Sequence, residues 1–148
     1  MAINWLFRRL AIGSLLDAES QPPVTSILGV CEQRAAISHQ LVRYVHLPFT
    51  DDMPIPDNPP VLDIALAFLR ESLERGETVL VHCHKGRSRS AALLTAYGYS
   101  IGMSLHEAFT YIQQHRPAVR WSIPLMQSVE QYFVGKAQHH DAYSSGGH

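Results

Sequence analysis

Apolar and polar positions along this 148-residue chain follow first the period of strands and then the period of helices. Four short stretches of apolar, often β-branched residues predict strands, at 10–16, 24–31, 41–49 and 78–83. The last of them, TVLVHC, shows no polar alternation, so we expect it to be buried on both faces of a parallel sheet. The lead-in before the first strand is mildly amphipathic and is more typical of an approach to that strand than of a membrane-surface helix.

A first helix is predicted from Pro59 to Arg75, because apolar residues recur there with helical spacing. Asn58 is placed to cap this helix, its prolines fit the first turn, and Gly76 ends it. Its polar stripe consists of Asp63, Ala67, Arg70 and Glu74. We expect its buried side to consist of Val61, Leu62, Ala65, Leu66, Phe68, Leu69 and Leu73.

Three more helices are predicted after the last strand. Residues 90–102 are apolar nearly all round, which is typical of a central helix. Ser104 and Glu107 form a capping box for the next helix. A final helix is predicted from about Ser122 to Lys136, with Leu125, Met126, Val129 and Phe133 facing inward.

The remaining segments set the domain boundaries. Residues 50–60 hold four prolines and three aspartates, which predicts an ordered surface loop rather than a strand or helix. Strands mixed with helices predict a single α/β domain over residues 1–137, with a central, mostly parallel sheet flanked by helices. Residues 138–148 are polar, and we expect them to form a disordered tail.

Composition narrows the range of functions. The chain carries 12 Lys and Arg against 13 Asp and Glu, a net charge of −1, which argues against a nucleic-acid partner. Two cysteines are too few for a disulfide framework. No long apolar run spans a membrane. We therefore expect a soluble, cytoplasmic domain without stable membrane insertion, in which any recognition of anions is local.

The stretch VHCHKGRSRS, residues 81–90, carries the candidate chemistry. Cys83 ends a buried strand, and a helix begins a few residues later, across Gly86. In that geometry successive backbone N–H groups can form an anion-binding nest at the helix N-terminus, and the Arg89 guanidinium can hold two phosphate oxygens. The same donors stabilise a thiolate, so the loop favours both an ionised Cys83 and a phosphate above it.

Two other interpretations of Cys83 compete with this one. A zinc site with His82 or His84 would need a second pair of ligands, and Cys31 stands alone. A buried structural thiol does not suit a polar, basic loop. We expect Cys31, at the end of a neighbouring strand, to be inert core.

The segment HCHKGRSRS matches the H-C-x-x-G-x-x-R-S/T signature of the cysteine-dependent protein tyrosine phosphatase superfamily. YVHLPFTD, residues 44–51, resembles the Y-x-x-I/L-P-x-x-D segment of its compact dual-specificity branch, and GSLLDA and RPAV resemble further segments of that branch. The resemblance covers about residues 10–134. It implies a dual-specificity phosphatase-like fold and phosphomonoester hydrolysis through a cysteinyl-phosphate.

The resemblance also implies roles for single residues. Cys83 would be the nucleophile, Ser90 would stabilise its sulfur, and His82 would brace the loop. Asp51 would be the general acid, although the adjacent Asp52 remains an alternative. The expected phosphate-binding residues are His84, Lys85, Gly86, Arg87, Ser88 and Arg89. No metal and no cofactor is implied.

Two departures from the branch bear on the substrate. The helix that usually follows GSLLDA is shortened here, so we expect a low pocket wall near Gln21–Pro23. Trp121 and Ser122 stand where many members have a Pro-Asn pair that steadies the site. A shallow pocket would admit phosphoserine and phosphothreonine as well as phosphotyrosine.

The substrate itself is left open between two classes. We expect a phosphorylated protein or a small anionic phosphate. Lys85 and Arg87 resemble residues in the loop of phosphatidylglycerophosphate phosphatases, which keeps a lipid or phosphoinositide substrate as an alternative. A catalytically dead phosphate-binding module is a third hypothesis. A rhodanese-like sulfur transferase would have no need for LPFTD.

Overall fold

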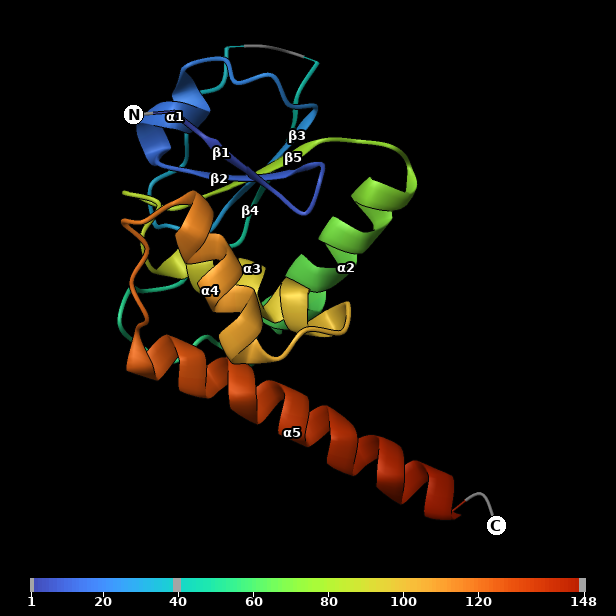
Figure 1. Cartoon of the computed structure of the whole chain (residues 1–148). Coiled ribbons are helices and arrows are strands. Elements are labelled where there is room, and N and C mark those ends of the chain that lie inside the picture. The colour runs from blue at the N-terminus through green and yellow to red at the C-terminus, as the bar shows by residue number, and fades with distance from the viewer. Residues whose placement is uncertain (1, 39–40, 147–148) are drawn as a thin grey trace.

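The computed structural model describes residues 2–38 and 41–146, with side chains described as far as residue 137. A five-stranded sheet forms its centre, in the order β1-β2-β5-β3-β4 (Figure 1). β1 pairs antiparallel with β2, and the other neighbouring strands are parallel. The strands are β1 (Asn4–Leu6), β2 (Leu10–Gly13), β3 (Ser26–Gly29), β4 (Arg43–His46) and β5 (Val79–His82).

Helices cover both faces of this sheet. The short α1 lies on one face, α2, α3 and α4 lie on the other, and α5 packs across the outer side of α3 (Figure 1). Their bounds are α1 (Leu15–Glu19), α2 (Val61–Glu74), α3 (Arg89–Ser100), α4 (Leu105–His115) and α5 (Ile123–Gly146). The expected α/β architecture with a mostly parallel sheet is thus confirmed.

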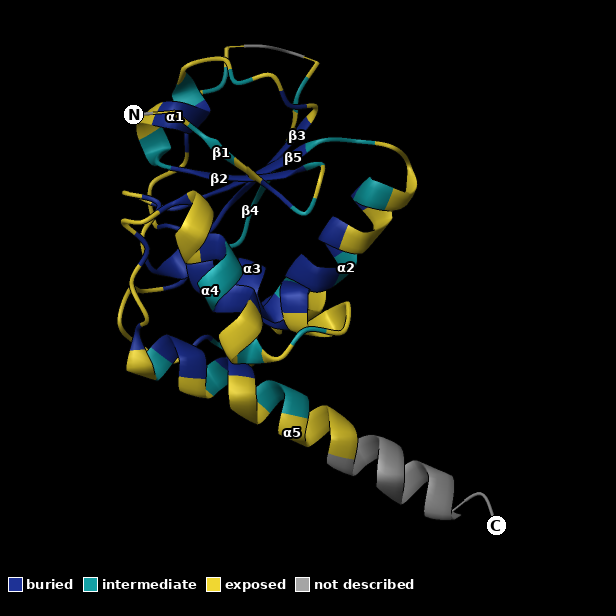
Figure 2. Cartoon of the chain, in the orientation of Figure 1, coloured by how far each residue is buried: buried dark blue, intermediate teal, exposed yellow. Residues whose placement is uncertain are grey.

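The sheet is buried on both faces, as the apolar β5 sequence predicts (Figure 2). In β5, Val79 and Val81 face the large core beneath α2–α5, whereas Leu80 faces a smaller core beneath α1. β2 follows the same alternation, with Leu10 and Ile12 on one side and Ala11 on the other. This two-sided burial fixes the register of the central strands and therefore the position of the loops that follow them.

The strands are shorter than predicted. Ser14 caps α1, and Leu15 and Leu16 belong to α1 rather than to β2. Ser14 and Asp17 form a capping box: the Ser14 hydroxyl accepts from the Asp17 N–H at 3.1 Å, and Asp17 accepts from the Ser14 N–H at 2.9 Å. The S-x-x-D spacing signals this helix start. The lead-in before residue 10 contains the separate strand β1, which the sequence reading did not resolve.

The prediction that Asn58 caps the first helix is wrong. α2 begins at Val61, Pro60 occupies the N-cap position, and no side chain makes a capping hydrogen bond there. Pro60 disfavours the helical conformation at Pro59, since a proline ring collides with the backbone of the residue before it. The prolines therefore stay in the loop, and residues 50–60 contain no helix or strand, as predicted.

The later helices follow their signals more closely. The Ser104–Glu107 capping box of α4 is confirmed, with hydrogen bonds of 3.0 and 2.9 Å. α5 continues past the predicted end at Lys136 to Gly146, because no proline interrupts the backbone there. The structure thus gives helical backbone to much of the predicted tail at 138–148, and the boundary of the domain at residue 137 stays a prediction.

Gly98 provides a test of how closely α3 and α4 pack. A Cβ at this position would lie 2.6 Å from the Ala108 Cβ, so Gly98→Ala should push the helices apart and lower the free energy of unfolding by about 1–3 kcal/mol. Gly135→Ala on α5 is the matched control, because nothing lies within 4 Å of its added Cβ. There alanine should raise stability by roughly 0.5–1 kcal/mol through helix propensity. Urea unfolding measures both changes, and stabilisation by Gly98→Ala would contradict this packing.

Candidate active site

Three loops meet where the parallel strands end. β5 leads into Cys83 and the loop before α3, β4 leads into the segment that ends in Asp51, and β3 leads into Glu32. Gly29, at the end of β3, pairs with both His46 and His82, so the three strands end level with one another. Carboxyl ends of parallel strands are the usual place for a ligand in an open α/β sheet.

These loops enclose a cavity of about 250 Å³. It contains Cys83 and most of the predicted phosphate-binding residues, together with Asp51 and Arg120. The lining residues are Asp51, Cys83, His84, Lys85, Arg87, Ser88, Arg89 and Arg120. Of the other predicted site residues, His82, Gly86 and Ser90 are buried behind this surface.

The loop from Cys83 to α3, here called the phosphate loop (residues 83–88), has an unusual backbone orientation. Four consecutive carbonyl groups, those of residues 84–87, accept hydrogen bonds from outside the loop. Leu15 N–H donates to His84 at 3.0 Å, and Arg120 N–H donates to Arg87 at 2.8 Å. In the part of the chain that the structure describes, no N–H group of residues 84–88 donates a hydrogen bond. Such free, successive amides are what an anion nest requires.

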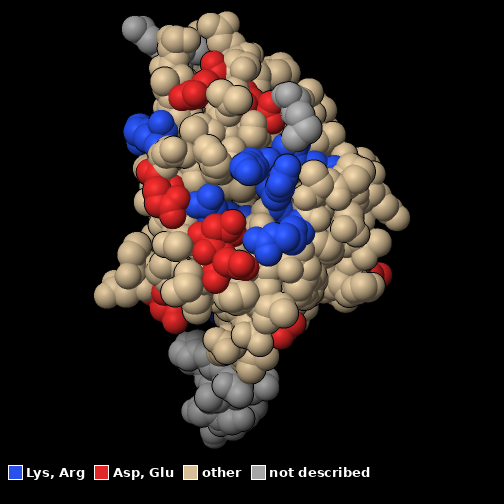
Figure 3. Space-filling view, turned by 90° about the vertical axis from the view of Figure 1, so that its left-hand side faces the viewer, with Lys and Arg blue, Asp and Glu red and all other residues tan. Residues whose placement is uncertain are grey.

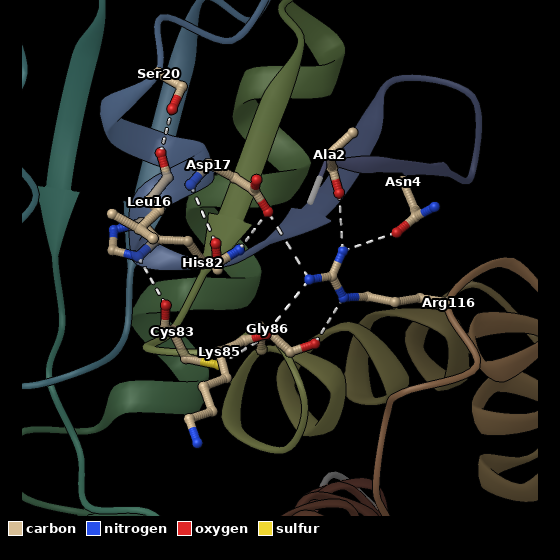
Figure 4. A network of polar contacts seen from close by, with 12 residues as sticks. Ala2, Asn4, Leu16, Asp17, Ser20, His82, Cys83, Lys85, Gly86 and Arg116 are labelled. Carbon is tan, nitrogen blue, oxygen red and sulfur yellow. Dashed lines mark hydrogen bonds and ion pairs between the residues drawn. The ribbon is translucent and has the colours of Figure 1, made fainter.

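Arg116 makes the two remaining carbonyl contacts (Figure 4). Its Nε donates to the Gly86 carbonyl at 2.8 Å and its Nη2 to that of Lys85 at 3.4 Å. Nη1 donates to Asn4 Oδ1 at 2.7 Å. The guanidinium is 3 % exposed, and its Nη2 lies 3.8 Å from Asp17 Oδ2. Arg116 therefore joins the N-terminal segment, α1 and the back of the phosphate loop.

Gly86 lets the loop turn at this point. Its φ is +67°, a conformation that side-chain-bearing residues rarely adopt. A Cβ here would also lie 2.7 Å from Arg116 Nη2 and from the Gly13 carbonyl oxygen. The glycine of the motif thus serves both the turn and the close contact with Arg116.

Cys83 is held from both sides. Its Sγ lies 3.2 Å from the Ser90 Oγ, and its carbonyl accepts from His82 Nδ1 at 3.3 Å. The Tyr44 hydroxyl oxygen accepts from the Ala35 N–H at 3.0 Å and donates to His82 Nε2 at 2.8 Å, which leaves the His82 proton on Nδ1. Burial lowers the pKa of His82, so the ring is neutral and braces the loop without adding a formal charge.

Arg89 is almost completely buried, at 8 % exposure. Its Nη1 donates to Glu32 Oε2 at 2.8 Å and to the Phe49 carbonyl at 3.3 Å. The pKa of Glu32 is lowered, first by a hydrogen bond from the Glu32 backbone N–H to the Glu32 carboxylate and then by the hydrogen bond from Arg89. Arg89 Nε has no partner, and it is the only buried side-chain N or O atom in that position among the described residues. Arg89 also lines the cavity, so its guanidinium is a candidate for binding an anion there.

The structure separates the two candidate acids. Asp51 lines the cavity that holds Cys83, whereas Asp52 does not. Asp52 Oδ1 accepts a 2.7 Å hydrogen bond from the Ser122 hydroxyl. Arg120 lies between the two carboxylates, 3.8 Å from Asp51 Oδ2 and 3.7 Å from Asp52 Oδ2. Ser122, which stands where many members have an asparagine, thus holds the Asp52 side chain, while Asp51, whose Oδ1 accepts from the Asp52 N–H at 2.9 Å, lines the cavity.

The predicted low wall near Gln21–Pro23 is not part of this site. These residues line a different cavity, of about 460 Å³, between α1, β3 and the segment before β4. The reason is topological: α1 lies on the opposite face of the sheet from α2–α4 (Figure 1), and the chain that follows it lines the cavity on that face rather than the one that contains Cys83.

Cys31 lies in the core and does not line the cavity that contains Cys83. Cys31 is fully buried, and burial raises the pKa of its thiol. Both cysteines are free. Among the described residues, no three His, Cys, Asp or Glu side chains form a group that could hold a metal ion. Within the same residues, no helix combines the length and the apolar character needed to cross a membrane.

Three residues of the site were missed by the sequence analysis. Arg116 is the first residue of the quoted RPAV segment and Arg120 follows it, but nothing in the pattern shows that their side chains or backbone reach the phosphate loop. Glu32 follows a predicted strand, and its pairing with Arg89 spans 57 positions of sequence. Only their arrangement in space identifies them.

Comparison with known proteins places this site in a family. The profile described as "Dual specificity phosphatase, catalytic domain" matches residues 12–134. The chain therefore belongs to the dual specificity phosphatase family, within the cysteine-dependent tyrosine phosphatase superfamily that the motif predicts.

Curated relatives resemble the chain over part of their length. Human serine/threonine/tyrosine-interacting protein is 33 % identical over 94 residues, which cover 63 % of this chain and 42 % of the relative. Dual specificity protein phosphatase Mpk3 of Drosophila melanogaster is 33 % identical over 95 residues, covering 60 % and 21 % respectively. The chain thus spans less than half the length of these relatives.

A solved structure extends the likeness over nearly the whole fold. A variant of human DUSP28 superposes with a TM-score of 0.82 and 27 % identity, covering 93 % of this chain and 99 % of that one. Human tyrosine phosphatase-like serine/threonine/tyrosine-interacting protein has the same fold, with a TM-score of 0.79, 24 % identity, and coverage of 92 % and 98 %.

Arg116 allows the support of the phosphate loop to be tested. Arg116→Met would leave Asp17 and two loop carbonyls without their partner, so we expect the free energy of unfolding to fall by about 3–5 kcal/mol. Arg116→Lys keeps the positive charge but lacks the planar guanidinium, so its free energy of unfolding should lie between those of Arg116→Met and the wild type. Urea unfolding measures stability, and calorimetry measures the affinity of the phosphate loop for inorganic phosphate.

The control for this substitution is Arg75→Met, because Arg75 is half-exposed and forms only a 3.8 Å ion pair with Glu71. Its effect should stay within about 0.5 kcal/mol. An Arg116→Met protein with wild-type stability and phosphate affinity would show that the loop keeps its shape without this contact.

Proposed function

We propose that this protein hydrolyses phosphomonoesters through a cysteinyl-phosphate intermediate, and that its substrates are phosphorylated tyrosine, serine and threonine side chains of proteins. One observation carries the proposal. The phosphate loop directs four carbonyls toward donors outside the loop and leaves its amides without acceptors among the described residues, around a cavity that Cys83 and Arg89 also line. A tetrahedral oxyanion matches these donors.

In the first step the Cys83 thiolate attacks phosphorus in line with the leaving oxygen. Arg89 and the loop amides bind the non-bridging oxygens and stabilise the charge that develops on them. Protonated Asp51 transfers its proton to the leaving alcohol or phenol. Its place on the cavity wall supports this role, and the engagement of Asp52 with Ser122 favours Asp51 over Asp52.

In the second step water breaks the sulfur–phosphorus bond. Asp51, now a carboxylate, accepts a proton from that water, and phosphate leaves while the thiolate reforms. Ser90 lies 3.2 Å from Cys83 Sγ and stabilises the departing sulfur with its hydroxyl. In this scheme Arg89 and the amides supply the positive potential, so no metal or cofactor takes part.

Other functions of the same site are kept as alternatives. A phosphatidylglycerophosphate or phosphoinositide phosphatase would use the same chemistry, and Lys85 and Arg87 on the cavity wall give it some support. A related structure of the same fold, PTPMT1, was solved in complex with PI(5)P. A phosphate-binding module without turnover is the third alternative, since one relative is named as an interacting protein.

The first test of this proposal is hydrolysis of an aryl phosphate in the presence of a metal chelator. The wild-type protein should hydrolyse the aryl phosphate. Cys83→Ser should abolish hydrolysis while phosphate binding persists, because serine keeps the shape of the loop but is a far weaker nucleophile. Cys31→Ala is the matched control and should retain activity. Binding without any wild-type turnover would favour the phosphate-binding module instead, and loss of wild-type activity on chelation would exclude the mechanism.

A second test assigns the acid. Asp51→Asn should lower kcat about 100-fold or more and remove the fall in rate at alkaline pH, because asparagine cannot donate a proton. The loss should be larger for alkyl than for aryl phosphates, since alkoxides are poorer leaving groups. Asp52→Asn should keep both limbs of the pH–rate profile. The opposite pattern would assign the proton transfer to Asp52.

A further inference from the structure

Arg120 stands at the edge of the active-site cavity, and neither the motif nor the proposed mechanism gives it a role. Its backbone is fixed to the phosphate loop, because its N–H donates to the Arg87 carbonyl at 2.8 Å. Its side chain is half-exposed, and among the described residues it is held only by the long ion pairs with Asp51 and Asp52, of 3.8 and 3.7 Å. The guanidinium is therefore anchored at its base and loosely held at its tip.

The cavity holds more positive charge than one phosphate needs. Arg89 and the loop amides account for the scissile group. Lys85, Arg87 and Arg120 also line the cavity, and no carboxylate of the described residues lies within 4.0 Å of the side-chain nitrogens of Lys85 or Arg87. Against these three cations the cavity wall carries a single carboxylate, Asp51, which is neutral when it acts as the acid.

The surrounding surface is not basic as a whole. Figure 3 shows the face toward which the carboxyl ends of the strands point, with Lys and Arg gathered at its centre and Asp and Glu directly beside them. Asp52 and Glu32 are exposed there, with side-chain exposures of 54 % and 62 %. These carboxylates repel an extended anionic membrane surface, whereas a single anionic group can still reach the central cations.

We propose that Arg120, together with Lys85 and Arg87, binds a second anionic group next to the scissile phosphate, and that this group is an acidic side chain flanking the phosphorylated residue of a peptide. The proposal rests on the proposed phosphatase function. The planar fork of Arg120 suits a carboxylate, and its loose ion pairs can be exchanged for the substrate at little cost. When Arg120 turns to the substrate, Asp51 is released from its contact.

The test compares kcat/KM for phosphotyrosine peptides of equal length, with either acidic or neutral residues beside the phosphosite. Wild-type protein should prefer the acidic peptide, and Arg120→Gln should reduce that preference about fivefold, the upper range for one exposed charge pair. Arg120→Lys should retain most of the preference. The preference should also shrink as ionic strength rises. Arg75→Gln is the control, because Arg75 has similar exposure and a 3.8 Å ion pair far from the cavity.

Two results would overturn the proposal. Equal losses on acidic and neutral peptides in Arg120→Gln would show that Arg120 acts only through the acid loop. A preference for phosphatidylglycerophosphate vesicles over the acidic peptide, lost in the same variant, would assign the second anion to a lipid.

Failure of the proposed function is recognised separately, by absence of wild-type turnover of the aryl phosphate. Binding of the two peptides to Cys83→Ser and to Cys83→Ser/Arg120→Gln, measured by fluorescence anisotropy, still tests Arg120 in that event. Cys83→Ser should bind the acidic peptide more tightly than the neutral one. In Cys83→Ser/Arg120→Gln the ratio of the two affinities should be about fivefold smaller. Equal affinities of both proteins for the acidic peptide would overturn the role of Arg120.

Discussion

The hydrogen bonds from Arg116 to the back of the phosphate loop are the contacts on which the other features of the site depend. A loop can present free amides to a ligand only if its carbonyls are satisfied elsewhere, because buried unpaired carbonyls are costly. The Arg116 side chain donates hydrogen bonds to the carbonyls of Lys85 and Gly86. The backbone N–H groups of Leu15 and Arg120 donate to the carbonyls of His84 and Arg87, respectively. The anion-binding side of the loop is thus a consequence of contacts made on its other side.

The same network explains why distant parts of the chain contribute to the site. Arg116 lies after α4, yet it reaches Asn4 at the start of β1 and Asp17 in α1. These partners come together because the double-sided core fixes β2 beside β5, with Gly13 opposite His82. Burying a guanidinium stabilises the fold only when all its hydrogen-bond and charged partners are present, because they offset the cost of removing it from water. The stabilities of the loop, α1 and β1 are therefore coupled.

On the open side of the loop the charges are arranged quite differently. Glu32 holds Arg89 through one nitrogen and leaves Nε without a partner, while Arg120 stays loosely bound between two aspartates. Rigid support behind and exchangeable ion pairs in front are what an anion-binding site requires, since ligands replace the weak contacts and not the strong ones.

The sequence by itself determined the fold class, the central apolar strand, the capping box of α4 and the order strand–cysteine–loop–arginine–helix. These follow from local signals: periodicity, capping spacing and a motif whose residues are neighbours in the chain. It also limited the candidates for the general acid to Asp51 and Asp52. It placed the α2 start two residues too early, at Pro59 with Asn58 as the cap, because the apolar pattern does not register the collision of the Pro60 ring with the residue before it.

Only the tertiary structure decided which of the remaining residues meet. The pairing of Arg89 with Glu32, the hold of Arg116 and the turn of Asp52 toward Ser122 join segments separated by 30 to 70 positions. The sequence assigned Gln21–Pro23 to the wall of the site, and the sheet places them against another cavity. Such contacts depend on which face of the sheet each helix covers and on strand register, and no local pattern of residues encodes either of these.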